Sequence, residues 1–498
     1  MKGSVTASAE RRRPNSLVTS AVTGGALAMQ ILLSIVVGFV VGRVLGRSEE
    51  TDGFFAAYAV FMVLSLAANA ARLVVLPAFA GARAAGRLAH ELMTSFAALA
   101  VLLVPATAVV LLAREPLATL LTGGGSAISV DTAADNLVWL VVAGLGQVVA
   151  GMLASALAAF DEYVVPAVGY LIASAAGLTL IVLTIHDART LAIGHGLTLS
   201  ACLAILVPGV WLVRRVARSP HPVGWRASRP RWAHVAARLK ALVTGSTLPF
   251  GFQALYLICL PFAGRLEVGS LTTLSYAYMV SGAVVTVGAS AIGLVTAVPL
   301  ARSELSSRQI AHHISSSSWL GLILVAFAMG LTFSLGNELA ASLLDPEYGS
   351  LGEVTLAMGP FMAVSVVLSI TFPVVLVLGR EKLLPRIVLA AVVLQVGIAA
   401  GGAALAGLTG IAWGLAFSTG LIAAAMLRAC GVLRSVSASV ARAVMVLACV
   451  TAPAFVVPTL LAGPWVGAAV GVVLSVTALV VVRPRPLVDA VHHVRTLS

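Results

Sequence analysis

Long apolar runs alternate with short charged or Gly/Pro-rich breaks along almost the whole chain. A membrane-spanning helix needs about 20 predominantly apolar residues, and nearly every run reaches that length. The runs cover residues 17–46, 53–81, 88–113, 135–160, 163–186, 190–213, 237–264, 269–300, 314–336, 351–379, 384–406, 408–430, 440–461 and 464–482. The pattern predicts an all-α integral membrane protein with 14 transmembrane helices.

The basic residues are distributed unevenly between the breaks. An even number of spans puts both termini on one side, and Lys and Arg concentrate in cytoplasmic loops of membrane proteins. A cytoplasmic N-terminus leaves on outward loops only Arg43, Arg47, Arg114, Arg189 and Arg265. Most acidic residues then face outward. We therefore expect both termini in the cytoplasm, and the inward basic residues would favour an anionic leaflet.

Composition agrees with a membrane protein and excludes several other classes. The chain is 60% hydrophobic and 10% charged, with a mean hydropathy of +1.04, whereas soluble domains are about 25% charged. Its net charge of +12 resides in short loops, so we expect no nucleic-acid partner. The four cysteines lie in apolar runs and are interpreted as small core residues. Arg-, Ala-, Val- and Gly-rich composition is associated with high-GC bacteria, and we expect the protein in a bacterial cytoplasmic membrane.

A sequence repeat divides the chain. Gly42-Arg43 and Tyr58-Ala59 have counterparts in Gly264-Arg265 and Tyr276-Ala277, and 193–197 matches 411–415. Spans one to six would then repeat as seven to twelve, giving two pseudo-symmetric lobes and two further helices, an architecture of transporters. The expected organisation is an N-terminal tail at 1–16, an N-lobe at 17–213, a basic linker at 214–236, a C-lobe at 237–432, spans thirteen and fourteen at 433–482 and a C-terminal tail at 483–498.

Polar residues form stripes on the first two helices of each predicted repeat. Arg72 is the one basic residue well inside a span, and on the same helix face lie Tyr58, Ser65 and Asn69. A charge at this depth usually faces a bundle interior or cavity. The predicted cavity residues are Arg72, Asn69, Ser65, Gln30, Gln253, Tyr256, Ser275 and Tyr278. The alternative is that Arg72 extends toward the headgroups and that the other side chains form helix-packing hydrogen bonds.

Other chemistry is weakly indicated. His195, between two glycines, is interpreted as a packed core histidine, with proton relay as the alternative. His312-His313 and His492-His493 have no partners at ligand spacing, so we expect no metal and no cofactor. The sequence has no Walker A pattern and hence no ATPase motor of its own.

Several segments resemble the MurJ/MviN family of lipid II flippases, within the multidrug/oligosaccharidyl-lipid/polysaccharide exporter (MOP) superfamily. They are the stretch 45–58, Leu76-Pro77-Ala78-Phe79, the stretch 269–277, and Ala159-Phe160 with Pro166-Ala167. The resemblance covers nearly the whole chain. It implies a flippase for polyprenyl-diphosphate-linked saccharides in cell-wall synthesis, whose cavity arginines bind the diphosphate. Lipids and cell-envelope assembly proteins are the expected partners.

The chain departs from the family pattern at the arginines. Met279 stands where the family's eighth helix carries an arginine, and Val37 and Gly38 stand where an Arg-Asp pair is expected. Arg43 and Asp52 match the family at the outer rim. Arg72 lies near the family's basic position on the second helix, out of strict register.

Four functions follow as hypotheses. The first is transport of a lipid-linked glycan by alternating access, and the second is export of an amphiphilic small molecule, which an arginine-poor cavity favours. A third is a membrane glycosyltransferase that would use Glu49, Glu50 and Asp52 as base and metal ligands. The fourth is an inactive scaffold. We expect a transporter rather than an enzyme.

Overall fold

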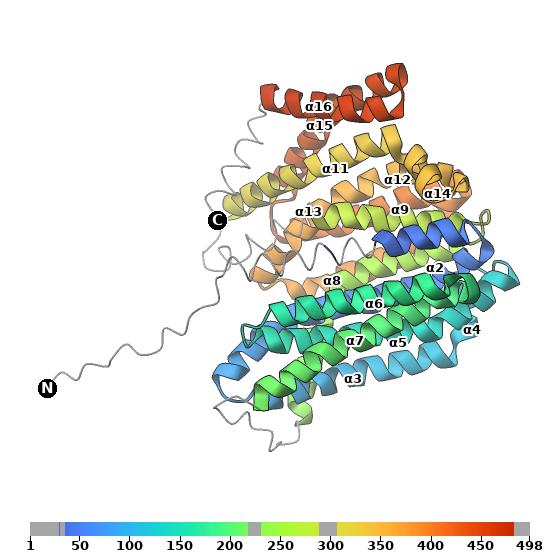
Figure 1. Ribbon diagram of the computed structural model, residues 1–498. Helices are drawn as coiled ribbons and strands as arrows, with labels where there is room; N and C mark the ends of the chain where they lie inside the picture. Colours follow the sequence, from blue (N-terminus) through green and yellow to red (C-terminus); the bar gives the residue numbers. More distant parts are fainter. Residues whose placement is uncertain (1–28, 30–34, 218–230, 288–305, 483–498) are drawn as a thin grey trace. The chain divides into compact units, whose positions relative to one another are not determined.

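The computed structural model describes residue 29 and residues 35–217, 231–287 and 306–482, and its elements are all helical (Figure 1). Gln30 lies outside these residues. The N-terminal helices are Ile35–Leu45, α2 (Glu49–Ala84), α3 (Leu88–Leu112), α4 (Arg114–Leu121), α5 (Ala127–Ala158), α6 (Val164–Ala188) and α7 (Thr190–Ala217). The later elements are α8 (Trp232–Ala263), α9 (Ser270–Val285), α11 (Ser307–Leu343), η2 (Pro346–Ser350), α12 (Leu351–Ala357), α13 (Gly359–Val377), η3 (Glu381–Leu383), α14 (Leu384–Ala429), α15 (Leu433–Ala462) and α16 (Pro464–Val482).

Among the described residues, 11 helices are long and apolar enough to cross a membrane. The expected count of 14 differs from this at three places. The first span is described as a helix only from Ile35, and α9 is 16 residues long as described. The third place is α14, which contains two helices joined by a kink. The protein is therefore a multi-pass helical membrane protein, and the number 14 stays a prediction.

Helix α14 reverses direction at Ala406 and Gly407, whose backbone leaves the helical region (φ 57° at Gly407). Its halves run antiparallel, because Gly402 contacts Gly410 and Ile398 contacts Gly414. The break falls where the predicted spans 384–406 and 408–430 meet. The positive φ of Gly407 lets the backbone reverse within two residues. The two helical segments therefore follow each other with almost no connecting loop.

The chain divides into two compact units. The first comprises residues 1–40, 64–108 and 138–242, and the second comprises 41–63, 109–137 and 243–498. The division passes through α2, α3, α5 and α8, so one end of several N-terminal helices groups with the C-terminal half of the chain. This grouping differs from the expected lobes at 41–63 and 109–137; the expected lobe boundaries stay a prediction.

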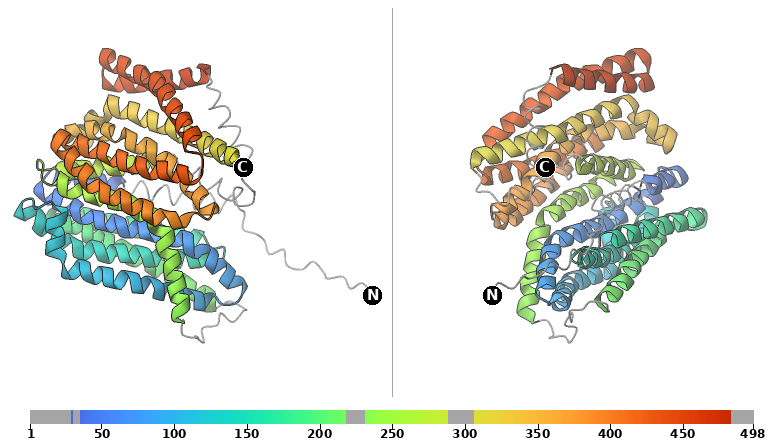
Figure 2. Two further views of the ribbon diagram at one scale, coloured as in Figure 1. Left: turned by 180° about the vertical axis from the view of Figure 1, so that it is seen from behind. Right: turned by 60° about the vertical axis from the view of Figure 1, so that its left-hand side comes forward.

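In the first unit, α6 and α7 form a hairpin and lie side by side in Figure 1 and in the right-hand view of Figure 2. A single residue, Arg189, connects them with φ 49°. The helices approach closely at Gly177 and Gly196, where a Cβ on Gly177 would lie 2.7 Å from the Gly196 carbonyl oxygen. His195 packs edge-on against Trp139, with ring centroids 4.5 Å apart.

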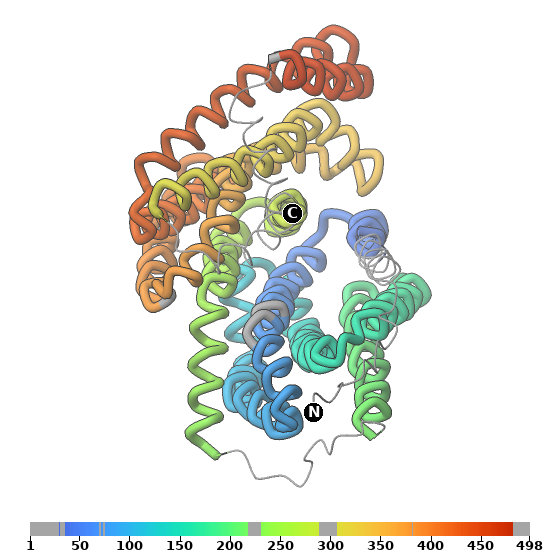
Figure 3. Tube along the Cα trace, turned by 90° about the vertical axis from the view of Figure 1, so that its left-hand side faces the viewer, coloured from blue at the N-terminus to red at the C-terminus, as the bar shows by residue number. Residues whose placement is uncertain are grey.

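In the second unit, α15 and α16 form a further antiparallel hairpin beside α11 (Figure 3). Gly463, with φ 86°, ends α15. Phe455 is fully buried and lies against Gly330 of α11 and Gly471 of α16. The hydroxyls of Ser334 and Thr459 are hydrogen-bonded at 2.7 Å. An aromatic ring inserted between glycines therefore anchors the two C-terminal helices.

Candidate functional site

A buried carboxylate joins the start of α2 to the start of α9, both within the second unit. Asp52 accepts hydrogen bonds from Gly269 N at 2.7 Å, Thr272 N at 2.8 Å and Thr272 Oγ1 at 2.6 Å. The first N–H groups of a helix have no intrahelical acceptor, and Gly269, the N-cap of α9, supplies no side-chain cap of its own. Asp52 thus caps a helix more than 200 residues away in sequence, and its charge favours the positive helix end.

Neighbouring groups extend this contact, which we call the α2–α9 junction (Arg47, Asp52, Gly269 and Thr272). The Arg47 side chain passes against Gly269, where the backbone has φ 82° and a Cβ would clash with it. Arg47 also acts electrostatically on Asp52. Only glycine adopts this φ without strain and also has no Cβ. Glycine at position 269 therefore permits both the turn before α9 and the close approach of the Arg47 side chain.

Tyr348 of η2 ties the turn before α2 to the same end. Its hydroxyl donates to Gly46 O at 2.8 Å, and burial raises the pKa of this phenol, so it stays protonated as a donor. Tyr276 of α9 lies edge-on between Phe55, at 4.9 Å between ring centroids, and Tyr348, at 5.6 Å. Arg43 donates to Leu344 O at 3.4 Å. The rim positions Arg43 and Asp52 therefore both contact C-terminal residues.

Glycines allow close backbone approach around the junction. A Cβ on Gly42 would lie 3.1 Å from the Tyr276 hydroxyl, and Gly53 lies against the Ser129 backbone. Gly123 contacts Pro261, and Arg265 Nε donates to Gly123 O at 3.1 Å. These contacts join residues 42–53 and 123–129 to the C-terminal half. The contact between these residues and the C-terminal half therefore depends on close backbone packing as well as on the Asp52 hydrogen bonds.

Four predicted cavity residues meet in the second unit and form what we call the tyrosine cluster (Gln253, Tyr256, Ser275 and Tyr278). Tyr256 and Tyr278 stack with ring centroids 4.0 Å apart. The Tyr256 and Ser275 hydroxyls are hydrogen-bonded at 2.7 Å, and Tyr278 donates to Gln253 Oε1 at 3.4 Å. Gln253 Nε2 is buried and finds no hydrogen-bond partner among the described residues. The cluster is neutral, and both N–H groups of the Gln253 amide are without a partner among the described residues.

A second polar contact lies deeper in the same unit. Gln395, fully buried, donates to Cys259 Sγ at 3.1 Å and accepts from the Ser418 hydroxyl. The three side chains come from α8 and the two halves of α14. Their hydrogen bonds satisfy polar groups that lipid or apolar packing could not, so this contact is structural.

Arg72, Ser65 and Asn69 belong to the first unit. Arg72 is exposed. Its aliphatic chain packs against Gly151 of α5, where an added Cβ would lie 3.3 Å from Arg72 Cδ. The guanidinium also interacts electrostatically with Tyr170 of α6. Ser65 is half-buried, and the side chain of Asn69 lies outside the described ones. Both roles proposed for Arg72, phosphate binding and extension toward headgroups, thus remain hypotheses.

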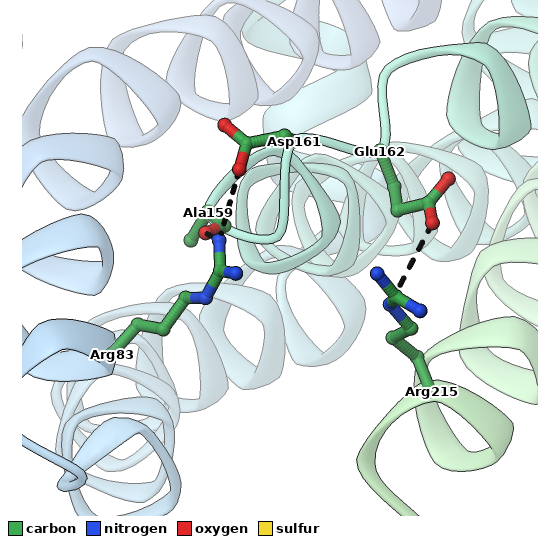
Figure 4. A network of polar contacts seen from close by, with 5 residues as sticks. All are labelled: Arg83, Ala159, Asp161, Glu162 and Arg215. Carbon is green, nitrogen blue, oxygen red and sulfur yellow. Dashed lines mark hydrogen bonds and ion pairs between the residues drawn. The ribbon is translucent and has the colours of Figure 1, made fainter. Parts of the chain in front are cut away.

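At one end of the first unit, charged side chains connect several helices (Figure 4). Arg83 donates to Asp161 at 3.2 Å and to Ala159 O, and its guanidinium lies 4.9 Å from the Phe160 ring centroid. Arg215 pairs with Glu162 at 3.6 Å. Arg238 of α8 pairs with Glu91 of α3. The contacts of Arg83 and Arg215 fix the loop 159–163, and no sequence pattern had singled out any of these pairs.

The sequence indicated Asp52 but not its partners. Thr272 and Gly269 appeared only within a stretch of family resemblance, Arg47 appeared there and among the outward-loop arginines without a role, and Tyr348 was not considered. A glycine followed by Ser-Leu-Thr before an apolar run is typical of a helix start, and this signal identifies α9. It does not show that the cap comes from another helix.

Comparisons with known proteins bear on the fold. No protein-family model and no curated protein sequence matches the chain. Solved structures do: "Lipid II flippase MurJ, inward closed conformation" is similar with TM-score 0.68 and 12% identity over 94% of this chain and 100% of that one. An inward-facing multidrug resistance MATE transporter of the MOP superfamily has TM-score 0.66 and 16% identity over 84% and 98%. The eukaryotic MATE transporter AtDTX14 has TM-score 0.56 and 14% identity over 87% and 98%. The chain therefore has the fold shared by these transporters.

Proposed function

We propose that the protein is a membrane transporter that moves a polyprenyl-diphosphate-linked saccharide across the bacterial cytoplasmic membrane by alternating access. The fold is that of MurJ and MATE transporters, and the sequence segments 45–58 and 269–277 resemble those of the lipid II flippases. Both termini would lie in the cytoplasm. Membrane lipids and cell-envelope assembly proteins would be its partners.

The observation that carries the proposal is the α2–α9 junction. It closes one end of the second unit with three hydrogen bonds to one carboxylate and with glycine contacts. If the helices separate, water can hydrogen-bond the Asp52 carboxylate and the first N–H groups of α9. Both arrangements then satisfy the same polar groups, so separating the helices would leave no buried hydrogen-bonding group without a partner at this contact.

The chemistry of the described residues suits such a substrate in two ways. Arg72 offers a guanidinium, the side chain that binds phosphate in a bidentate manner. In the tyrosine cluster Tyr256, Ser275 and Gln253 are buried, so the half-buried Tyr278 is the member whose ring a sugar could contact. Asp52 already accepts three hydrogen bonds from the start of α9, which argues against its use as a general base or metal ligand and supports transport over glycosyl transfer.

A second candidate, export of an amphiphilic small molecule, is favoured by the neutral tyrosine cluster. Met279 next to Tyr278 provides no charge where the resemblance leads one to expect an arginine. Aromatic and apolar walls with few polar groups are typical of small-molecule sites. The two candidates share the junction and differ only in the substrate.

The test is transfer of a fluorescent polyprenyl-diphosphate saccharide between leaflets of liposomes containing the purified protein. We expect Arg72→Ala to lower the rate about tenfold, the loss typical of a charged hydrogen bond, and Arg72→Lys to retain part of it. Arg214→Ala removes an exposed arginine with no ion pair among the described residues and is the matched control.

If the saccharide were transferred no faster than in empty vesicles while amphiphiles were transported, the export of an amphiphilic small molecule would become the favoured function. Absence of transport in both assays, from protein that is folded by thermal unfolding, would overturn transport and support a scaffold. An Arg72→Ala rate equal to that of Arg214→Ala would remove Arg72 from the substrate site.

A further inference from the structure

An apolar groove of about 680 Å³ lies within the second unit between α11, α13, α14 and α15. On α11 its lining residues include Leu322, Val325, Met329 and Phe333, spaced as one face of a helix. The only side-chain hydroxyls in the lining belong to Ser437 and Thr451. Thr451 donates to Leu447 O at 2.8 Å, so it presents no unsatisfied donor. The groove is suited to a hydrocarbon chain.

Small residues keep the groove open. On α14 the lining consists of Gly420, Ala423 and Ala424 before Leu427, and alanines recur on the facing side of α15. A Cβ on Gly420 would meet no atom within 4 Å. Since Phe455 already anchors α15 to α11 and α16, the space beside α14 is a consequence of residue choice rather than of loose packing.

One end of the groove is basic. Arg428 follows Leu427 at the end of α14 and continues the row of Gly420 and Ala424 at intervals of four residues. Arg434, in the first turn of α15, precedes Ser437 and Ala441 on the groove face. Both arginines are exposed, and neither takes part in an ion pair among the described residues. They lie on either side of the turn 430–432.

We propose that the groove binds one acyl chain of an anionic glycerophospholipid, whose phosphate lies between Arg428 and Arg434. Two guanidinium groups can hydrogen-bond phosphate oxygens, and the positive end of α15 adds to the attraction. Basic residues at the cytoplasmic surface attract anionic lipids, and the positive-inside pattern puts these arginines there.

The size of the groove selects the occupant. Sites of about 300–1,000 Å³ hold small ligands, whereas a transmembrane helix, about 10–12 Å wide and 30 Å long, needs several times that volume. A phospholipid is also present around the protein at high concentration. The inference does not depend on the transported substrate, only on the membrane orientation proposed above.

The first experiment measures retained lipid by native mass spectrometry of the full-length protein. The protein is titrated with phosphatidylglycerol and, separately, with phosphatidylcholine carrying the same acyl chains. We expect preferential retention of one phosphatidylglycerol, and about a tenfold loss of that preference in the double variant Arg428→Gln/Arg434→Gln. The control Lys382→Gln/Arg386→Gln changes the charge equally at positions outside the groove lining and should retain it.

A second variant tests the binding site of the lipid acyl chain rather than that of the lipid headgroup. Gly420→Leu places a side chain into open groove space and should displace the bound lipid without disturbing packing. Gly401→Leu, at another α14 position where a Cβ meets nothing within 4 Å but outside the lining, is the matched control. Thermal unfolding of each variant confirms that lost binding is not lost folding.

Equal retention of the two phospholipids by the wild type would overturn the proposal, as would unchanged binding in both the double variant and Gly420→Leu. Retention of a polyprenyl phosphate but not of phosphatidylglycerol would also overturn it and assign the groove to the tail of a transported lipid. That outcome would leave the proposed function intact, so the two proposals fail separately.

Discussion

Two helical hairpins in the chain share a geometry but differ in the chemistry of their contact. Hairpin α6–α7 turns at Arg189 and the α14 hairpin turns at Gly407, both with positive φ. Arg189 and Gly407 occupy equivalent positions of the predicted repeat, because their separation in sequence equals that of Gly196 and Gly414. At the same separation, Gly177 of the first hairpin corresponds to Gln395 of the second.

The contacts at these two positions are different. Gly177 lets the α6 backbone touch that of α7, and a Cβ there would also lie 3.0 Å from Ser200 Cβ. Gln395 instead receives a hydrogen bond from Ser418 and reaches Cys259 of α8. Both hairpins have close backbone contacts, at Gly177–Gly196 and at Gly402–Gly410. The second hairpin adds polar side chains that also connect it to a third helix.

The largest effect should follow from filling the backbone contact. Gly196→Val places side-chain atoms against Ile181 and the Gly177 carbonyl, so α6 and α7 must separate. We expect a loss of about 3 kcal/mol or more in the free energy of unfolding, in the range of severe overpacking, seen as a lower midpoint in thermal unfolding. Gly401→Ala, where a Cβ meets nothing within 4 Å, should leave the midpoint unchanged or raise it.

Removing the polar contact should cost less. Gln395→Leu keeps the volume but leaves the Ser418 hydroxyl without its acceptor, and a buried unsatisfied group costs about 1–3 kcal/mol. The combined variant Gln395→Leu/Ser418→Ala should recover part of the loss, because it removes both partners. A double variant no more stable than Gln395→Leu would show that the hydrogen bond does not stabilise this hairpin.

The turn at Gly407 should tolerate substitution poorly. Its backbone, with φ 57° and ψ −134°, is essentially confined to glycine, and strain of this kind costs about 1–3 kcal/mol. Gly407→Ala should lower the thermal midpoint, whereas Gly401→Ala in the same helix should not. An unchanged midpoint would mean that the turn adopts another conformation at no cost.

Substitution at the equivalent turn of the first hairpin should change the stability by the smallest amount. Arg189 adopts φ 49° and ψ −125° with a side chain present. Arg189→Gly relieves this backbone strain but loses the interactions of the arginine. We therefore expect a change within about 1 kcal/mol of the wild type, determined from the same thermal unfolding curves. A large loss would show that Arg189 itself stabilises the turn.

The α2–α9 junction and the charged end of the first unit differ in a similar way. Asp52 is buried and caps a helix, whereas the Arg83–Asp161 pair has side chains 40% and 82% exposed. Exposed pairs contribute about 0–1 kcal/mol, so charges at the junction matter more to conformation than those shown in Figure 4.

Much of the fold could be predicted from local pattern. The apolar runs predicted the helical segments, and the break at residues 406–408 predicted the reversal inside α14. Polar residues on α8 and α9, namely Gln253, Tyr256, Ser275 and Tyr278, contact one another in the structure, and their role as cavity residues stays a prediction. The short helix α4 was missed, since its eight residues carry too little apolar periodicity to distinguish it from a loop.

The sequence by itself determined that this is a multi-pass helical membrane protein, because a bilayer accepts only long apolar helices whose backbone groups are satisfied internally. It also determined which positions could bend or approach closely, because these need glycine. Only the tertiary structure decided that Asp52 caps α9, that Gln395 connects three helical segments and that small residues on α14 face those on α15 across a groove. Those outcomes depend on which helix faces end up adjacent, and apolar periodicity is the same for many possible neighbours.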